Sequence, residues 1–203
     1  MAVTIKRTGM LLIISGPSGT GKGTLVKKLM DSDPSFRFSC SVTTRKPREG
    51  EIEGVHYHFV SEEEYARMVA NGDFLEHATV HGHSYGTLRK PVEEMMAEGY
   101  NVLLDIDPQG AISVMENAGD YVSIFILPPS FQDLRVRLHT RNTDDPAEIE
   151  RRLNNARGEV KKIDRYQYAI INDNLELAFS QLQSIANAEK HRTTRFKPTI
   201  SEC

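Results

Sequence analysis

A glycine-rich loop directly follows an apolar run near the start of the chain. Residues 10–15 read MLLIIS, and residues 16–24 read GPSGTGKGT. The spacing from Gly16 to Gly21 and Lys22 is that of a phosphate-binding loop, whose glycines let successive backbone N–H groups point at phosphate oxygens. The helix expected after the loop adds the positive end of its dipole, and the lysine supplies a full charge. This segment predicts a nucleoside triphosphate site formed by Gly16, Pro17, Ser18, Gly19, Thr20, Gly21, Lys22, Gly23 and Thr24.

The position after the lysine departs from the usual pattern of such loops. A serine or threonine there commonly places its hydroxyl on Mg²⁺, whereas this chain has Gly23 followed by Thr24. Mg²⁺ keeps several waters and binds substrate phosphates directly, so weaker ligation by the protein is compatible with its use. We therefore expect Mg²⁺ to accompany the nucleotide, with Thr24 and Asp107 as its ligands, directly or through water.

Four polar side chains between residues 45 and 85 suit a second phosphate group. Arg45 and Arg48 stand three residues apart in a polar segment, and their guanidinium groups match the geometry of a dianionic phosphate. Tyr57 and Tyr85 can donate phenolic hydrogen bonds to the same group. Each residue taken singly is also compatible with a solvated arginine or a packed tyrosine. Together they predict a site for the phosphate of a nucleoside monophosphate.

A carboxylate interrupts the strand-like segment FLEHATV at residues 74–80. Glu76 can accept two hydrogen bonds side by side. Guanine offers its N1–H and N2 amino groups as adjacent donors, whereas adenine offers no such pair. The alternative is a strand residue that faces solvent. The first interpretation makes Glu76 the residue that recognises guanine.

Two aspartates follow the apolar run at residues 101–104. Asp105 and Asp107 come at the end of this run, and ligand sites in open α/β sheets lie outside the carboxyl ends of the strands. A carboxylate there can hold Mg²⁺ or orient a substrate. Each aspartate is a candidate for this role, and a structural contact with the backbone of a neighbouring loop is the alternative for Asp105.

Several arginines flank a polar segment at residues 140–148. Arg137 precedes it, Arg141 lies at its start, and Arg152 follows it on a predicted helix. Arginines in such positions can stabilise charge on a transferring phosphoryl group. Arg151 is the alternative to Arg152 as the residue that turns inward.

Strand-like runs alternate with helical patterns along the chain. The runs cover residues 10–15, 36–42, 55–60, 74–80, 100–107, 121–127 and 168–171. Helices are predicted at 22–32, 62–71, 91–98, 109–117, 130–139, 146–163 and 174–190. Short apolar runs that alternate with helices indicate a buried parallel sheet. We predict an α/β fold, a parallel sheet flanked by helices, with a small mixed α/β lobe and a short lid inserted into it.

The composition is that of an ordinary globular protein. Of its 203 residues, 39% are hydrophobic and 26% are charged, and the formal net charge is −3. This charge argues against nucleic acid or an anionic membrane as a partner, and no apolar stretch has the length of a membrane span. We expect a cytoplasmic protein with small-molecule substrates and a disordered tail at residues 191–203. The sequence predicts no oligomeric state.

Five segments in the same order resemble the guanylate kinase family across nearly the whole chain. They are GPSGTGKGT (16–24), FSCSVTTRKPREGEIEGVHYHFV (38–60), FLEHATVHGHSYGT (74–87), LLDIDPQG (103–110) and RLHTR (137–141). The resemblance implies an ATP:GMP phosphotransferase with Mg²⁺ as cofactor. It implies a phosphate-loop core at residues 1–39, 89–128 and 150–203, a GMP-binding lobe at 40–88 and a lid region at 129–149.

The resemblance also implies roles for individual residues. Arg45, Arg48, Tyr57 and Tyr85 would hold the phosphate of GMP, and Asp107 would line the metal and GMP region. Arg137, Arg141 and Arg152 would close over ATP, so that the predicted catalytic residues are Lys22, Arg45, Arg137, Arg141, Arg152 and Asp107. The residues predicted to bind GMP are Ser41, Arg45, Arg48, Tyr57, Glu76, Tyr85, Thr87 and Asp107.

Two alternatives remain beside this interpretation. Another phosphate-loop kinase, such as an adenylate or ribosyl-phosphate kinase, would share the loop, but it would not need the acceptor residues found between 41 and 87. A non-catalytic guanylate-kinase-like binding module would share the acceptor lobe, but such modules usually have a degraded loop. The intact loop and the complete acceptor pattern both favour a guanylate kinase.

Overall fold

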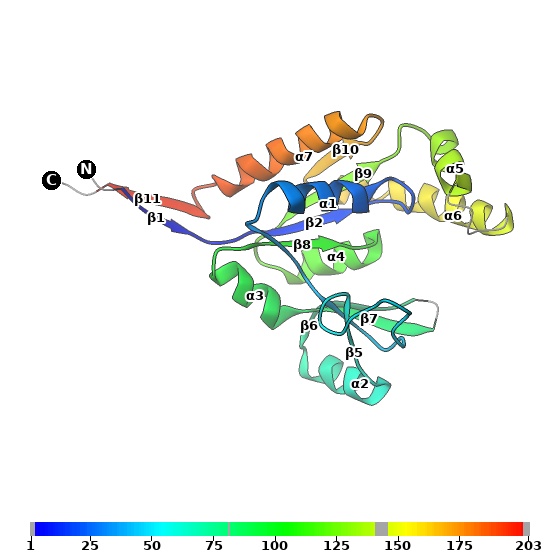
Figure 1. The fold of residues 1–203 in the computed structure, drawn as a ribbon, viewed down its shortest axis with the longest axis horizontal. Helices are drawn as coiled ribbons and strands as arrows, with labels where there is room; N and C mark the ends of the chain where they lie inside the picture. Colours follow the sequence, from blue (N-terminus) through cyan, green and yellow to red (C-terminus); the bar gives the residue numbers. More distant parts are fainter. Residues whose placement is uncertain (1–2, 81, 141–145, 201–203) are drawn as a thin grey trace.

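A five-stranded parallel sheet forms the centre of the computed structural model, which describes residues 3–80, 82–140 and 146–200 (Figure 1). Its strands are β2 (Leu11–Ser15), β3 (Phe36–Phe38), β8 (Asn101–Asp105), β9 (Val122–Leu127) and β10 (Tyr168–Ile171). They lie in the order β10–β9–β2–β8–β3, and every neighbouring pair is parallel. This confirms the predicted parallel sheet.

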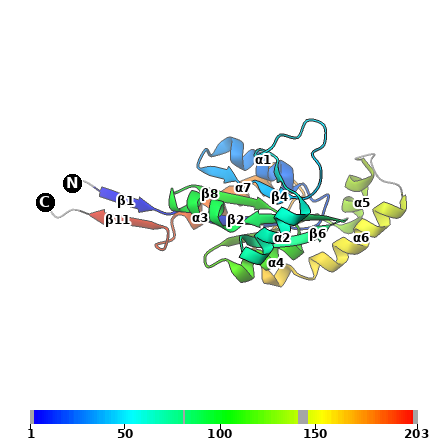
Figure 2. The ribbon, with the colours of Figure 1, turned by 90° about the horizontal axis from the view of Figure 1, so that it is seen from below.

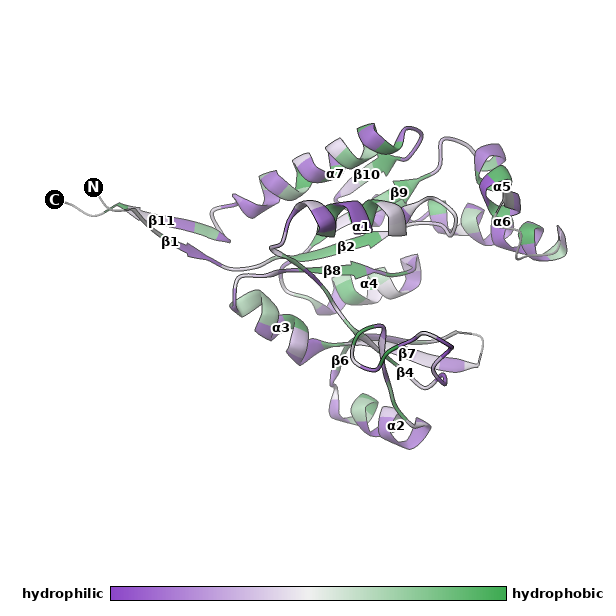
Figure 3. Ribbon diagram, in the orientation of Figure 1, coloured by the Kyte–Doolittle hydropathy of each residue, from purple (hydrophilic) through white to green (hydrophobic). Residues whose placement is uncertain are grey.

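Helices cover both faces of this sheet because its strands bury side chains on both sides. In β2, Leu12 and Ile14 join one hydrophobic cluster, and Leu11 and Ile13 join another. The first cluster includes side chains of α1 (Lys22–Ser32) and α7 (Leu175–Lys190). The second includes side chains of α3 (Arg89–Ala97) and α4 (Pro108–Asn117). Figure 3 shows the result: the strands β2, β8 and β9 of this sheet are mostly hydrophobic, whereas the helices alternate between polar and apolar residues.

A second sheet of four strands carries one helix and forms a separate lobe below the core in Figure 1. Its strands are β4 (Ser41–Thr43), β5 (Tyr57–Phe59), β6 (Phe74–Val80) and β7 (His83–Leu88), in the order β5–β4–β7–β6. Helix α2 (Glu62–Asn71) packs on it through a small cluster of Val42, Tyr65 and Phe74. The sheet is mixed, because β4 pairs parallel with β5 and antiparallel with β7.

One strand prediction in this region was wrong, and one strand was missed. The run at 36–42 is not one strand: β3 pairs with β8 in the core, whereas β4 pairs with β5 and β7 in the lobe. Strand β7, which was not predicted, pairs antiparallel with β6. Its sequence, HSYGTL, lacks the apolar alternation that would have marked it.

Helices α5 (Phe131–Thr140) and α6 (Pro146–Val160) pack on each other at one end of the molecule. They share a cluster of Leu134, Leu138, Ile149, Leu153 and Ala156. Helix α6 ends three residues before the predicted boundary at 163, and a short 3₁₀ helix (Ile163–Arg165) then leads toward β10. None of the described helices is long and apolar enough to cross a membrane.

The ends of the described chain pair with each other, contrary to the expectation of a disordered tail. Strand β1 (Val3–Arg7) runs antiparallel to β11 (Phe196–Ile200), with Ile5 opposite Pro198. The two strands form a ribbon that projects from the core, at the opposite end from α5 and α6 (Figure 1; Figure 2). The tail had no apolar periodicity, and its partner lies at the other end of the sequence.

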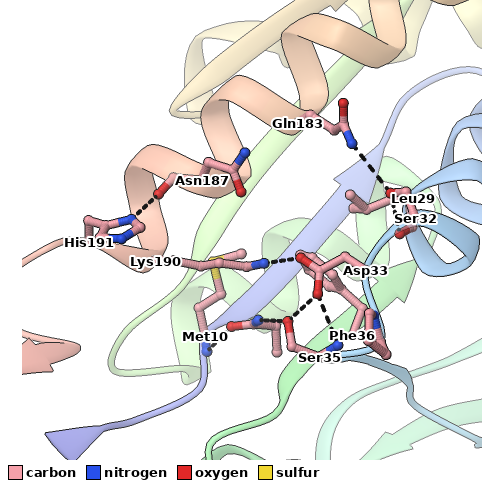
Figure 4. A network of polar contacts seen from close by, with 12 residues as sticks. Met10, Leu29, Ser32, Asp33, Ser35, Phe36, Gln183, Asn187, Lys190 and His191 are labelled. Carbon is pink, nitrogen blue, oxygen red and sulfur yellow. Dashed lines mark hydrogen bonds and ion pairs between the residues drawn. The ribbon is translucent and has the colours of Figure 1, made fainter. Parts of the chain in front are cut away.

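A polar network ties α7 to the loop between α1 and β3. Lys190 forms an ion pair with Asp33, whose Oδ1 accepts hydrogen bonds from the backbone and the hydroxyl of Ser35 (Figure 4). Asn101, at the start of β8, donates to Ser35 Oγ at 2.9 Å and accepts from the backbone N–H of Met10 at 3.2 Å. The network therefore holds the end of the sheet opposite to the glycine loop.

Candidate active site

The glycine loop connects β2 to α1 in a conformation that depends on glycine. Gly16, Gly19 and Gly21 have φ angles of 135°, 90° and 88°, which residues with side chains rarely adopt. A Cβ atom at Gly16 would also lie 2.2 Å from the carbonyl oxygen of Ile126 in β9. The loop therefore packs directly on the sheet, and larger residues at these positions would displace it.

Hydrogen bonds from the side chains of Thr20 and Asn172 fix the conformation of the loop. Thr20 Oγ1 donates to the carbonyl oxygen of Pro17 at 2.9 Å. Asn172 Nδ2 donates to the carbonyl oxygen of Thr20 at 2.8 Å, and Asn172 is buried directly after β10. No motif in the sequence marked Asn172, although its place at the carboxyl end of a predicted strand was a signal that could have found it.

Lys22 is the first residue of α1, and its side chain bends back over the loop. Its Nζ donates to the carbonyl oxygens of Gly16 at 2.7 Å and Pro17 at 3.0 Å. The amino group and the positive end of the α1 dipole therefore meet at the same place. This arrangement favours an anion in front of the loop.

A pocket of about 440 Å³, the phosphate pocket, opens in front of the loop. Three acidic residues line it together with Lys22, namely Asp105, Asp107 and Glu159. Burial raises the pKa of Asp105 and of Glu159, and the nearby Lys22 charge acts in the opposite direction on both. Glu159 lies on α6, and no pattern in the sequence distinguished it from a solvated helix residue.

Asp107 has a structural role in addition to its place in this pocket. It is the N-terminal cap of α4, and its Oδ1 accepts from the backbone N–H groups of Gln109 at 2.7 Å and Gly110 at 3.1 Å. These bonds satisfy helix donors that have no partner within the helix. They also fix the orientation of the carboxylate at the end of β8.

A second pocket of about 240 Å³, the acceptor pocket, lies between the four-stranded sheet and the end of β8. Residues of both elements line it: Ser41, Tyr57, Glu76, Ala78, Tyr85, Gly86, Asp105, Ile106 and Asp107. Asp105 and Asp107 also line the phosphate pocket. The two pockets therefore adjoin along this short segment.

Glu76 points into the acceptor pocket from β6 and is only 8% exposed. Its Oε1 accepts from Thr87 Oγ1 at 2.8 Å, and Thr87 is completely buried. Burial raises the pKa of the Glu76 carboxyl, whereas the Thr87 hydroxyl lowers it in part. The alternative of a solvent-facing Glu76 is therefore wrong. Thr87 contacts the carboxylate and does not line the pocket itself.

Arg45 lies at the acceptor lobe in a bidentate ion pair with Glu51. The Nη1–Oε2 and Nη2–Oε1 distances are 3.0 and 2.8 Å. Glu51 also accepts from the backbone N–H of Arg48 at 2.7 Å, and these contacts lower the pKa of Glu51 to about 2. The Arg45 guanidinium lies 5.5 Å from the centre of the Tyr57 ring. No pattern in the sequence marked Glu51, because its pairing with Arg45 needs the folded turn.

The structure brings most of the predicted phosphate-holding residues together. Tyr57 and Tyr85 meet edge to face with ring centres 6.0 Å apart, and both line the acceptor pocket. Arg45 contacts Tyr57, whereas the side chain of Arg48 is exposed on the neighbouring turn.

A third pocket of about 430 Å³, the side pocket, lies on the other side of the glycine loop. Thr24 and Arg137 line it, and Arg137 Nη2 donates to the carbonyl oxygen of Asn172 at 2.8 Å. Thr24 is exposed there and does not line the phosphate pocket. Gly23, which does line the phosphate pocket, directly precedes Thr24 on α1, and consecutive helix residues point about 100° apart. The structure therefore does not bring Thr24 and Asp107, the two predicted metal ligands, to one pocket.

The structure decides between Arg151 and Arg152 as the arginine that turns toward the glycine loop. Arg152 donates to Ser18 Oγ in the glycine loop. Arg151 pairs with Glu148 one turn earlier on α6, through bonds of 2.8 and 2.6 Å. Arg152 is therefore the residue that faces the loop. Arg141 lies outside the described residues.

A lysine-bearing glycine loop at the carboxyl end of a parallel sheet holds a nucleotide, and a pocket that adjoins it can present an acceptor. The fold and the site define a small-molecule kinase of the phosphate-loop class. The chain belongs to the guanylate kinase family, whose profile matches residues 8–189. Members of this family are ATP:GMP phosphotransferases.

Relatives match almost the whole chain. It is 46% identical over 194 residues to the guanylate kinase of Clostridium perfringens, covering 96% of this chain and 90% of that protein. It is 48% identical to the guanylate kinase of Rhizobium etli, covering 95% and 88%. The crystal structure of guanylate kinase from Anaplasma phagocytophilum superposes with a TM-score of 0.75 at 37% identity, covering 96% and 93%.

Proposed function

We propose that this protein transfers the γ-phosphoryl group of ATP to GMP, and also to dGMP. The observation that carries the proposal is the junction of the phosphate pocket and the acceptor pocket at residues 105–107. A phosphate on the glycine loop and a phosphate in the acceptor lobe would approach each other there. Direct transfer needs such an approach.

The donor side is formed by the loop, Lys22 and the arginines of α5 and α6. Backbone N–H groups of the loop and Lys22 would bind the β- and γ-phosphates. Arg152, which contacts Ser18, would add charge beside them. Arg137 and Thr24 would contact the remainder of the donor nucleotide in the side pocket. Arg141 is proposed as a further lid arginine on the strength of the family pattern.

The acceptor side separates recognition of the phosphate from recognition of the base. Arg45, Arg48, Tyr57 and Tyr85 would hold the phosphate of GMP, and Glu51 would orient the Arg45 guanidinium. Deeper in the pocket, Glu76 would accept from guanine N1–H and N2, with Thr87 fixing its carboxylate. Ser41 lines the same pocket and would donate to guanine O6.

Catalysis by this arrangement rests on position and charge. A phosphate oxygen of GMP is already a competent nucleophile, so the reaction needs no general base. Lys22, Arg152 and Arg45 would hold the two anions at bonding distance and neutralise the charge that develops between them. Closure of the acceptor lobe and of the region at 129–149 over the core would exclude water, which would otherwise accept the phosphoryl group.

Mg²⁺ fits the donor set of the phosphate pocket. Asp105 Oδ2 lies 3.9 Å from where a Cβ atom of residue 23 would stand, so an oxygen ligand is present close to the loop. Asp105 and Asp107 would hold the ion directly or through water, and the ion would offset the negative charge of the phosphates. Among the described residues no cluster of three acidic, histidine or cysteine side chains is arranged to hold a metal, so phosphates and water would supply most ligands.

The proposed organisation follows the family pattern. The core would comprise residues 1–39, 89–128 and 150–203, the GMP-binding lobe 40–88, and the lid region 129–149. We also propose that the protein acts in the cytoplasm, where its nucleotide substrates are present.

A coupled assay that offers ATP with GMP, AMP, CMP or UMP in parallel tests the proposal. We expect rapid ADP formation with GMP and little with the other three nucleotides. Rapid ADP formation with AMP and none with GMP would assign the acceptor pocket to adenine. ADP formation without any acceptor would show that the site hydrolyses ATP.

A further inference from the structure

Gly110 is a buried glycine in a helix whose backbone does not require it. It is the third residue of α4, in the first turn of the helix, and it is not among the glycines with a positive φ angle. Alanine is preferred to glycine in a helix interior, because glycine loses more backbone freedom on folding. A close contact with the rest of the structure explains glycine at this buried position.

The contact that an added side chain would make is with Glu76. A Cβ atom at Gly110 would lie 3.2 Å from Glu76 Oε2 and 3.7 Å from Glu76 Cδ. The first distance is tighter than an ordinary van der Waals contact, whereas Asp107 Oδ2, at 3.8 Å, would be at ordinary range. An alanine at position 110 would therefore push on the Glu76 carboxylate in particular.

A hydrogen bond to Thr87 holds the carboxylate on its other side. Its other oxygen, Oε1, accepts from Thr87 Oγ1 at 2.8 Å, and both side chains are buried. A shift of a few tenths of an ångström would stretch this bond or move Oε2 further into the acceptor pocket. Either change alters the position of the carboxylate oxygens at the pocket.

We propose that Gly110 is a specificity-determining positioning residue: its missing side chain sets the depth at which the Glu76 carboxylate lies in the acceptor pocket. At this depth both oxygens match the N1–H and N2 donors of guanine. The inference rests on the proposed function, because it assumes that Glu76 recognises the base. Gly110 touches no reacting atom and acts through Glu76 alone.

Gly110→Ala tests the proposal, with Gly158→Ala as the matched control. Gly158 is also a helix glycine, in α6, and a Cβ atom there would meet no atom within 4 Å. In the coupled assay we expect Gly110→Ala to lower kcat/KM for GMP on the order of tenfold, mainly through KM, since hydrogen bonds to a charged group weaken quickly with distance. The KM for ATP and the weak activity with AMP should not change. Gly158→Ala should match the parent for all three nucleotides.

A double-mutant cycle shows whether Gly110 acts through Glu76. In a Glu76→Ala background the added Cβ atom meets no carboxylate, so Gly110→Ala should lower kcat/KM for GMP by less than about twofold. A tenfold loss that persists in this background would overturn the proposal. If the parent phosphorylates GMP and Gly110→Ala has the same KM for GMP as the parent, the role of Gly110 is overturned and the proposed function stands. A parent that does not phosphorylate GMP would overturn both.

Discussion

Replacing Glu76 by glutamine removes one acceptor from the acceptor pocket and leaves its shape nearly unchanged. In the structure, Glu76 Oε1 accepts from Thr87 at 2.8 Å and Oε2 lies next to Gly110. In Glu76→Gln the Thr87 hydroxyl would keep its acceptor if the amide oxygen took the Oε1 position. The amide N–H₂ would then stand at the Oε2 position and meet a donor of guanine.

The cost of this mismatch can be worked out from the bond that is lost. A hydrogen bond to a charged group contributes about 1.5–3 kcal/mol. At 1.36 kcal/mol for each factor of ten, kcat/KM for GMP should fall about 10- to 150-fold. Adenine has an acceptor at N1 and a donor at N6, which an amide can complement, so the penalty against AMP should shrink. The KM for ATP should stay the same, because Glu76 does not line the phosphate pocket.

The assay is ADP formation at varied GMP and at varied AMP, with parent and variant at matched ATP concentrations. Glu51→Gln is a useful comparison, because Glu51 contacts the predicted phosphate-holding Arg45 and not the base pocket. It should weaken GMP binding without changing the preference for GMP over AMP. If Glu76→Gln discriminates GMP from AMP as sharply as the parent, Glu76 does not recognise guanine.

Three further predictions follow from the same site. Lys22→Ala should lower the rate of phosphoryl transfer by several orders of magnitude with unchanged thermal unfolding, and near-parental turnover would remove Lys22 from the mechanism. Burial raises the pKa of Glu76, so as the pH falls its carboxylate should gain a proton at a higher pH than an ordinary glutamate does. GMP affinity should fall with this protonation. Parallel KM–pH profiles in parent and Glu76→Gln would contradict this, because glutamine cannot titrate. Thr24→Ala should leave the Mg²⁺ requirement of the initial rate unchanged, since Thr24 lines the side pocket; a markedly higher requirement would place its hydroxyl on the metal.

Local spacing in the sequence was sufficient for the elements whose conformation is decided by neighbouring residues. The glycine loop is one such element, since three of its glycines have the positive φ angles that the loop needs. Helix α2 is another: Ser61 and Glu64 stand at capping distance, and Ser61 Oγ accepts from the Glu64 N–H at 3.1 Å. The apolar run before the loop likewise predicted a strand that is buried on both faces.

Contacts between residues far apart in the sequence decided the rest. The run at 36–42 divides between two sheets because β8 pairs with its first half and β7 with its second. The ribbon forms because Val3–Arg7 and Phe196–Ile200 meet from opposite ends of the chain.

The same distinction holds inside the site. The sequence predicted Lys22 and Asp107 as nucleotide-site residues from their types and their positions after strands, and Glu76 from a carboxylate within a strand-like segment. It could not decide which of Arg151 and Arg152 faces the loop, because a helix turns by about 100° per residue and the answer depends on where α6 packs. Nor could it show that Thr24 and Asp107 line different pockets, that Glu51 holds Arg45, or that Thr87 holds Glu76. Those relations exist only once the sheets and helices are packed, because each joins side chains whose orientation is set by tertiary contacts.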